Sequence, residues 1–346
     1  MSWLYFTILI ALPTFFATPS GAPEAPLQPL SGPGGSTYLH DSVRVSDFAD
    51  EPHGYWLFEP THPQPDSAPV IVFNHGYGAL NPMVYGGWIR HLVRRGNIVV
   101  FPRYQKNMFS PLPRKFAINI SRAIHASRVE LLQPGRVRPQ WDQMLMVGHS
   151  YGGAMSAYLA ARHEQYQIPR PLGIMLCAPG TGPLRGGRLD DYAAIPEDIG
   201  ILLVNNARDQ VVGDPFQYRI FATATSTPYR NMLRQLPDTY GSPALGAGHN
   251  ECYSLDLAFD SGRRNPTVLR SFRVGQIDAL DYYGYWKLLD AMADCLRNGA
   301  QCDIAFGHTT EQLSMGTWSD GTPIQPFEPV AHPTQQENKE YALDTK

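Results

Sequence analysis

The feature that most constrains this chain is an apolar run that enters a glycine-rich turn and leaves it as an alanine-rich segment. The run reads MLMVGHSYGGAMSAYLAAR, and its centre, Gly148-His149-Ser150-Tyr151-Gly152, fits the pattern G-x-S-x-G. We expect a buried strand before the turn and a helix after it, because side chains flanking the serine would clash in so sharp a bend. The turn would lift Ser150 out of the sheet and aim the helix N-terminus at a reacting oxygen. The plainer alternative is a glycine-rich turn with a spectator serine.

Short apolar runs alternate with longer helical patterns through the rest of the chain. Continuous apolar strands are typical of a parallel sheet that helices cover on both faces. The alternation therefore predicts an α/β fold with a mostly parallel central sheet, helices on both faces and a single catalytic domain. The predicted strands are 70–73, 97–101, 144–147, 172–177, 201–204 and 232–236, and the predicted helices are 88–95, 117–132, 155–162 and 278–296.

Composition excludes several classes of protein. The 346 residues carry a formal charge of −3, with 17% charged residues and 43% apolar residues. That balance excludes a disordered chain and a polybasic nucleic-acid binder, so no nucleic-acid partner is expected. The sequence has no CxxC pair and no phosphate-binding G-x-x-x-x-G-K motif, and Gln167 stands where a zinc-binding H-E-x-x-H would need its second histidine. No metal and no cofactor is predicted.

Cys295 and Cys302 are close enough to bridge in an oxidising compartment, and reduced thiols are the alternative.

The N-terminus has its own composition. Residues 3–17 are apolar, a length that suits the core of a signal peptide and is short for a membrane span. We expect a signal peptide or anchor at 1–17, a Pro/Gly-rich linker without packed structure at 18–36, the catalytic domain at 37–300 and a C-terminal extension at 301–346. The protein is then secreted or periplasmic, with membrane anchoring as the alternative. Membrane contact is expected only through the N-terminal segment.

The GHSYGG turn and the FNHGYGA run at 73–79 resemble the α/β-hydrolase superfamily, and within it the dienelactone-hydrolase, acetylhydrolase and cutinase-like branch. The resemblance covers about residues 69–297. It implies the α/β-hydrolase fold and a serine nucleophile. It also implies a catalytic triad in the chain order serine, acid, histidine.

The acid of such a triad follows a late strand. The run GILLVNNARDQVV ends a predicted strand with Asp209 at its exit, and this carboxylate is our first candidate. Asp214, five residues later, is the second. A plainer role for Asp214 is to cap the helix that begins DPFQYRIF.

Three histidines follow the candidate acids. His249 lies in the small-residue loop LGAGHNE, where the superfamily places its histidine, although 40 residues separate it from Asp209. His308 comes after the last long predicted helix, where a structural role is expected, and His332 lies in the tail. Ser150, Asp209 and His249 are therefore the predicted triad.

The sequence His75-Gly76 after the first buried strand matches the superfamily's oxyanion loop. The backbone N–H groups of Tyr77 and Tyr151 are the predicted donors to an oxyanion. Together the candidates predict a serine hydrolase that cleaves carboxylic esters of small molecules, lipids or polymers through an acyl-enzyme. The alternatives are a serine peptidase of the same fold and a catalytically silent binding protein. The polar segment 179–198 is either a cap over the acyl pocket or a surface loop.

Overall fold

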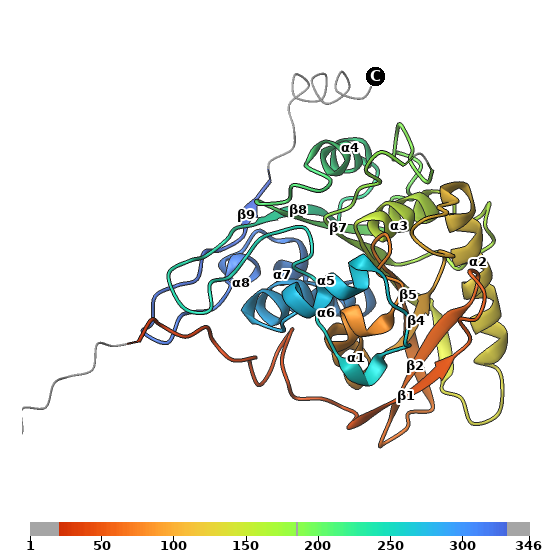
Figure 1. Ribbon diagram of the computed structural model, residues 1–346, viewed down its shortest axis with the longest axis horizontal. Helices are drawn as coiled ribbons and strands as arrows, with labels where there is room; N and C mark the ends of the chain where they lie inside the picture. The colour runs from red at the N-terminus through yellow and green to blue at the C-terminus, as the bar shows by residue number, and fades with distance from the viewer. Residues whose placement is uncertain (1–20, 185, 331–346) are drawn as a thin grey trace, which may run out of the picture.

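The computed structural model describes residues 21–184 and 186–330. Its centre is a nine-stranded sheet in the order β1-β2-β4-β3-β5-β6-β7-β8-β9 (Figure 1). The predicted signal peptide and His332 lie outside the described residues. The strands are β1 (Ser42–Asp47), β2 (Tyr55–Thr61), β3 (Ser67–Asn74), β4 (Ile98–Pro102), β5 (Arg138–His149), β6 (Gly173–Cys177), β7 (Gly200–Asn206), β8 (Arg230–Gln235) and β9 (Glu328–Pro329).

The six central strands, from β4 to β8 in the sheet order, are parallel, which confirms the predicted fold class. Antiparallel pairing occurs at the two ends, between β1, β2 and β4 and between β8 and β9. The sequence analysis did not predict β1, β2 or β9. These strands lie outside the strand–helix alternation from which the others were inferred.

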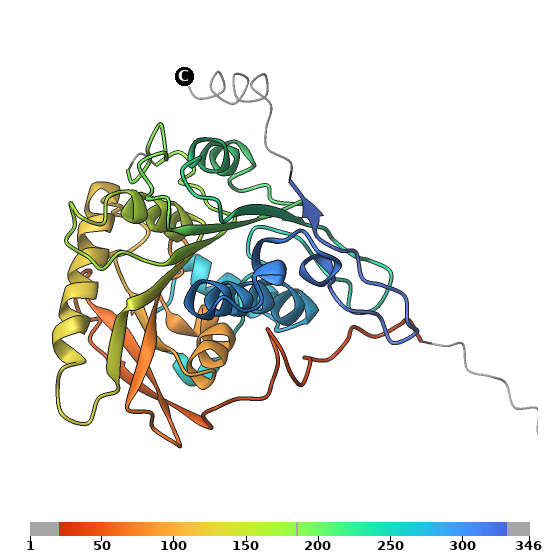
Figure 2. The same ribbon diagram turned by 180° about the vertical axis from the view of Figure 1, so that it is seen from behind.

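Helices cover both faces of the sheet, as expected. Side chains alternate between the faces, so that Phe73 of β3 joins the core beneath α1 and α6, while Val72 joins the core beneath α2, α3 and α4. Figures 1 and 2 show the two layers from opposite sides. The helices are α1 (Gly86–Arg94), α2 (Pro113–Glu130), α3 (Tyr151–Ala161), α4 (Pro215–Thr223), α5 (Pro266–Val274), α6 (Trp286–Asn298), α7 (Cys302–Phe306) and α8 (Thr310–Leu313), with 3-10 turns η1 (Pro82–Tyr85) and η2 (Leu257–Phe259) and a π-helical turn η3 (Leu280–Tyr285).

The predicted linker at 18–36 needs a correction where the structure describes it. Residues 21–36 contain no helix or strand, but they are packed against the domain. The N–H of Gly34 donates to the buried carboxylate of Asp290 at 2.8 Å, and the hydroxyl of Tyr282 donates to the carbonyl of Pro26 at 2.5 Å. Proline and glycine exclude regular structure here without preventing contact, because backbone groups can still bond to side chains of α6 and η3. Figure 1 shows this segment running past α6 towards β1.

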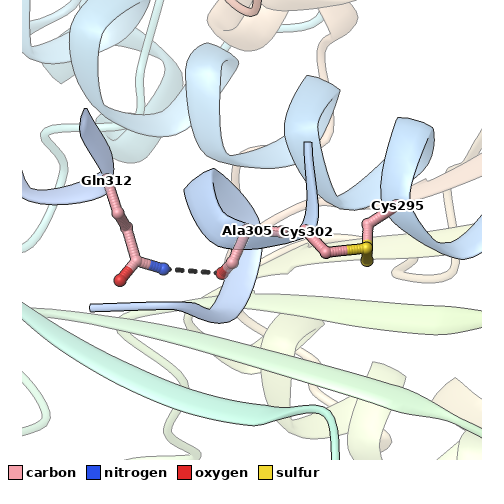
Figure 3. Close-up of a disulfide and its surroundings, with 4 residues drawn as sticks. All are labelled: Cys295, Cys302, Ala305 and Gln312. Atoms are coloured by element: carbon pink, nitrogen blue, oxygen red, sulfur yellow. Dashed lines mark hydrogen bonds between the residues drawn. A yellow bond between two sulfur atoms is a disulfide. The ribbon is translucent and has the colours of Figure 1, made fainter. Parts of the chain in front are cut away.

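The segment after residue 300 continues the same domain. A disulfide joins Cys295 of α6 to Cys302 of α7, and the side-chain amide of Gln312 donates to the carbonyl of Ala305 at 2.6 Å (Figure 3). Beyond α8, the chain reaches the sheet as β9 and pairs with β8. Trp318 and Phe327 are buried in the core that α1 and α6 cover. Cys177 and Cys252 are unbridged and buried.

None of the helices in the described ranges combines the length and the hydropathy that crossing a membrane requires.

A buried lysine attaches the C-terminal segment to α6. The Nζ of Lys287 donates to the carbonyl oxygens of Glu311, Gln312 and Ser314 at 3.0, 2.9 and 2.6 Å. Burial lowers the pKa of Lys287 to about 7. Three carbonyls at the end of α8 therefore share one donor group.

We expect Lys287→Met to leave these carbonyls unpaired and to lower the free energy of unfolding by about 1–3 kcal/mol. Urea denaturation measures the loss, and hydrogen exchange should rise first in residues 309–330. Exposed Lys115→Met is the matched control, with no expected change. Unaltered exchange in 309–330 would contradict this role of Lys287.

Candidate active site

The candidate residues converge at one edge of the sheet. Tyr77 follows β3, Ser150 follows β5, Asp209 follows β7 and His249 lies in the loop after β8. Because these strands are parallel, their carboxyl ends meet at the same edge, which is where α/β sheets place their ligands.

Ser150 stands in a strained turn between β5 and α3. Its φ of 53° and ψ of −120° are rarely adopted by a residue with a side chain. The glycines on both sides are required by close backbone approach. A Cβ on Gly148 would overlap the carbonyl oxygen of Gly152, and a Cβ on Gly152 would overlap the carbonyl oxygen of Asn74 in β3. The strand–turn–helix predicted from the sequence is therefore present, with α3 beginning at Tyr151.

The structure brings Ser150, His249 and Asp209 into a hydrogen-bonded row. The Nε2 of His249 lies 2.9 Å from the Oγ of Ser150, and its Nδ1 lies 2.7 Å from the Oδ2 of Asp209. The His249 and Asp209 side chains are only 7% and 1% exposed. With Asp209 ionised, Nδ1 carries the proton and Nε2 is left as an acceptor for the serine hydroxyl.

Asp209 is held as a carboxylate. Burial acts to raise its pKa, but hydrogen bonds from His249 and from the backbone N–H groups of Val211 and Val212 outweigh burial and lower the pKa. The Oδ1 atom accepts these two N–H groups at 2.8 and 3.2 Å. One oxygen of Asp209 thus fixes the loop after β7, and the other orients the imidazole.

The second-choice candidates lie in other surroundings. Asp214 stands at the N-cap position of α4, where its carboxylate accepts a hydrogen bond from Asn205 at 3.1 Å and caps no helix N–H. His308 bonds to Asn231 on β8 through Nε2 at 2.9 Å, at the junction with α7 and α8. The hydrogen bonds with Ser150 and its imidazole partner are made by His249 and Asp209.

The two predicted oxyanion donors both border the serine. Among the described residues, no acceptor takes the backbone N–H of Tyr77 or of Tyr151. Tyr151 is the first residue of α3, so its N–H belongs to the positive end of the helix dipole. These are the groups that the oxyanion loop requires.

A cavity of about 320 Å³ opens beside the serine. Its lining is mainly apolar, and part of segment 179–198 forms one wall of it. Such a space accepts an apolar group next to Ser150. The lining residues are Tyr77, Ser150, Tyr151, Gly180, Thr181, Gly182, Pro183, Leu184, Val211 and Val212.

A buried chain of hydrogen bonds connects the three loops of the site. The N–H of Gly76 donates to the hydroxyl of Tyr85 at 2.8 Å, and that hydroxyl lies 2.8 Å from Nδ1 of His149. The Nε2 of His149 lies 2.8 Å from the carbonyl of His249. Since a carbonyl only accepts, Nε2 carries the proton and Nδ1 accepts from Tyr85.

Burial keeps the side chains of this hydrogen-bond network uncharged. Burial first, and then the nearby His249, lower the pKa of His149 to about 3, and burial raises the pKa of Tyr85 well above its usual value. No pattern in the sequence predicted that these two side chains form a hydrogen-bond chain beneath the site. The position of His149 inside the serine turn was the one signal for it.

Glu251 is a second residue that the sequence analysis did not select. It follows His249 by two residues, and its Oε2 accepts the N–H of Gly248 at 2.8 Å. Burial, together with the charge of Asp278, raises the pKa of Glu251 to about 7, although the bond from Gly248 opposes the shift. The histidine loop is therefore supported by a carboxyl group that titrates near neutral pH.

Within the part of the chain that the structure describes, no three His, Cys, Asp or Glu side chains gather in a way that could hold a metal ion.

Glu251→Gln should flatten the pH dependence of stability. The pKa of Glu251 is about 7 in the folded state against an ordinary 4.5, so its stabilisation is full below pH 4.5 and is lost as pH rises through 7. Between pH 5 and pH 8 the wild type should lose about 2–3 kcal/mol more than the variant, measured by urea denaturation. Exposed Glu311→Gln is the control and should behave as the wild type. Equal losses in wild type and Glu251→Gln would refute the assignment.

The sequence matches the family named chlorophyllase over residues 39–181. That range runs from just before β1 to just after β6 and includes Tyr77 and Ser150, but it ends before Asp209 and His249. No curated protein matches the chain. The narrower likeness to the dienelactone-hydrolase, acetylhydrolase and cutinase-like branch stays a prediction.

The matched family is one of the α/β-hydrolases, and the sheet order, the serine turn after β5 and the helices on both faces agree with it. The predicted resemblance to the α/β-hydrolase superfamily is therefore confirmed.

Proposed function

We propose that this protein is a serine hydrolase of carboxylic esters, with Ser150, His249 and Asp209 as its catalytic triad. The observation that carries the proposal is the row of hydrogen bonds from Ser150 through His249 to Asp209. The match to an α/β-hydrolase family of ester hydrolases supports the reaction class.

The first half of the reaction forms an acyl-enzyme. The Oγ of Ser150 attacks the ester carbonyl while Nε2 of His249 takes its proton, and Asp209 stabilises the imidazolium that results. The backbone N–H groups of Tyr77 and Tyr151 hold the negative oxygen of the tetrahedral intermediate. His249 then gives its proton to the leaving alcohol as the carbon–oxygen bond breaks.

The second half releases the acid. A water molecule attacks the acyl-enzyme, His249 accepts one of its protons, and the intermediate collapses with return of the proton to Ser150. The aspartate keeps its charge throughout, because its hydrogen bonds lower its pKa. No metal or organic cofactor takes part in this scheme.

The cavity indicates the substrate class. Leu184, Val211 and Val212 give it apolar walls, which suit the acyl or alcohol part of a small to medium ester. Chlorophyll, after which the matched family is named, belongs in the substrate panel as one candidate. A peptide substrate and a silent binding role are the alternatives that the assay must exclude.

We also propose that the protein is exported, with membrane anchoring by the N-terminal segment as the alternative. The disulfide between Cys295 and Cys302 supports an oxidising compartment, and the apolar run at 3–17 supports a signal peptide.

Ser150→Ala should abolish turnover of p-nitrophenyl esters, with kcat lowered at least about 1,000-fold because the nucleophile is lost. The assay compares short and long acyl chains, chlorophyll and a peptide anilide. Labelling by a fluorophosphonate probe reports the serine directly, and Ser226→Ala, at an exposed serine between α4 and β8, is the control that should still be labelled. A wild-type protein that is neither labelled nor active would contradict the esterase proposal and favour a binding protein. A preference for the anilide would favour a peptidase.

Tyr85→Phe tests the hydrogen-bond chain beneath the triad. The variant deprives Gly76 N–H of its acceptor and His149 of its donor, so both the oxyanion loop and His249 lose support. We expect kcat for a soluble ester to fall roughly tenfold or more, with little change in KM, because misplacing reacting groups weakens the transition state most. Tyr282→Phe, which removes a buried hydroxyl bonded to Pro26, is the matched control. Equal kcat values for the two variants would contradict a positioning role.

A further inference from the structure

The mouth of the Ser150 cavity is bordered by the loop that precedes α2. The hydroxyl of Tyr77, a cavity-lining residue, donates to the carbonyl of Met108 at 2.5 Å. The carbonyl of Gly186 accepts the hydroxyl of Tyr151, another cavity-lining residue, and the backbone of Gly186 lies against Pro113, the first residue of α2. We call residues 106–115, together with Val211, the entrance surface.

Apolar side chains of the entrance surface face water. Phe109 is 84% exposed, Leu112 is 51% exposed and Val211 is 57% exposed. Single exposed apolar residues are common on proteins. Here Val211 lines the Ser150 cavity, Leu112 lines a neighbouring groove, and Phe109 follows Met108, whose carbonyl accepts the hydroxyl of Tyr77. The proposed reaction uses neither Phe109 nor Leu112.

The same part of the chain is strongly cationic. No aspartate or glutamate occurs from residue 67 to residue 129, although the protein as a whole has 31 acidic and 28 basic residues. The segment holds nine Lys and Arg residues: Arg90, Arg94, Arg95, Arg103, Lys106, Arg114, Lys115, Arg122 and Arg128. Arg90 and Arg95 pair with Asp256 and Asp290, and Arg103 is buried. The cations in or just before α2, Lys106, Arg114, Lys115 and Arg122, are exposed and attract anionic surfaces.

A groove of about 440 Å³ lies beside the entrance surface and combines both properties. Lys106, Lys115 and Arg122 line it together with Leu112 and Ile118, and no carboxylate is among its lining residues. Lys106, Lys115 and Arg122 are exposed. The groove thus offers cations beside apolar carbon, the pattern that suits an anionic head group on an apolar chain.

An aromatic wall separates the groove from the cavity. The ring of Phe116 lies 5.1 Å from that of Tyr104 and 5.1 Å from that of Tyr151. Tyr104 and Phe116 line the groove, whereas Tyr151 lines the cavity. A surface bound at the groove would therefore lie next to the opening that leads to Ser150.

We propose that the entrance surface and its groove dock on an anionic lipid surface, with Phe109 and Leu112 inserted among the lipids and the lysines at the head groups. Cations near such a surface gain energy from its negative potential, and apolar side chains gain by leaving water. The sequence predicts membrane contact through the N-terminal segment alone, so this is a second contact. Docking would present esters held in lipid to Ser150, and only this purpose rests on the proposed function.

The test is co-sedimentation of the full chain with vesicles of phosphatidylglycerol and with vesicles of phosphatidylcholine. The test variant combines Lys106→Glu, Phe109→Ser and Lys115→Glu. The matched control combines Arg128→Glu, Leu132→Ser and Arg138→Glu, which change two exposed cations and one exposed apolar residue near the amino-terminal end of β5. Thermal unfolding confirms that both variants fold.

We expect the test variant to bind phosphatidylglycerol vesicles at least tenfold more weakly than the wild type, and the control within twofold of it. Unchanged binding by the test variant, equal loss in the control, or equal wild-type binding to both lipids would each overturn the proposal. Hydrolysis of a soluble short-chain ester should be the same in all three proteins. If all three proteins are inert towards esters but still show the expected binding pattern, the proposed function fails and the docking proposal stands.

Discussion

The close approach of the turn around Ser150 to β3 is the constraint on which the site depends. Gly152 touches the backbone of Asn74 so closely that no side chain fits between them. The contact is reinforced by polar groups, since the amide of Asn74 donates to Ser156 and the hydroxyl of Ser156 donates to the carbonyl of Gly152. This packing holds Ser150 in a backbone conformation of high energy, and places its N–H on the carbonyl of Cys177 in β6.

His149, which lies in this turn, connects it by hydrogen bonds to the neighbouring loops. Its ring lies between the hydroxyl of Tyr85 and the carbonyl of His249, and Tyr85 in turn receives the N–H of Gly76. A charged imidazole here would have to be desolvated, so burial selects the neutral ring, which donates at one nitrogen and accepts at the other. The turn of Ser150, the loop after β3 and the loop of His249 are thus connected by one neutral side chain.

The segments before β1 and after α6 pack against the domain and add contacts to it. Residues 302–330 add a ninth strand, a disulfide to α6 and three carbonyls for Lys287, while residues 21–36 contact α6 and η3. The 39 residues between Asp209 and His249 contain α4 and β8, and the stretch from His249 to α6 contains η2, α5 and η3.

The sequence by itself determined the strand–turn–helix around Ser150 and the parallel centre of the sheet. Each follows from residues within a few positions of one another, because glycine spacing and apolar periodicity act on the local backbone. Only the tertiary structure shows that His249 and Asp209 form a hydrogen-bonded row with Ser150, and that Cys295 and Cys302 meet. It alone revealed that His149 and Glu251 bond to the histidine loop and that residues 21–36 and 302–330 are packed. Those outcomes depend on the register of parallel strands and on loops tens of residues long, and no local pattern records which side chains such loops bring into contact.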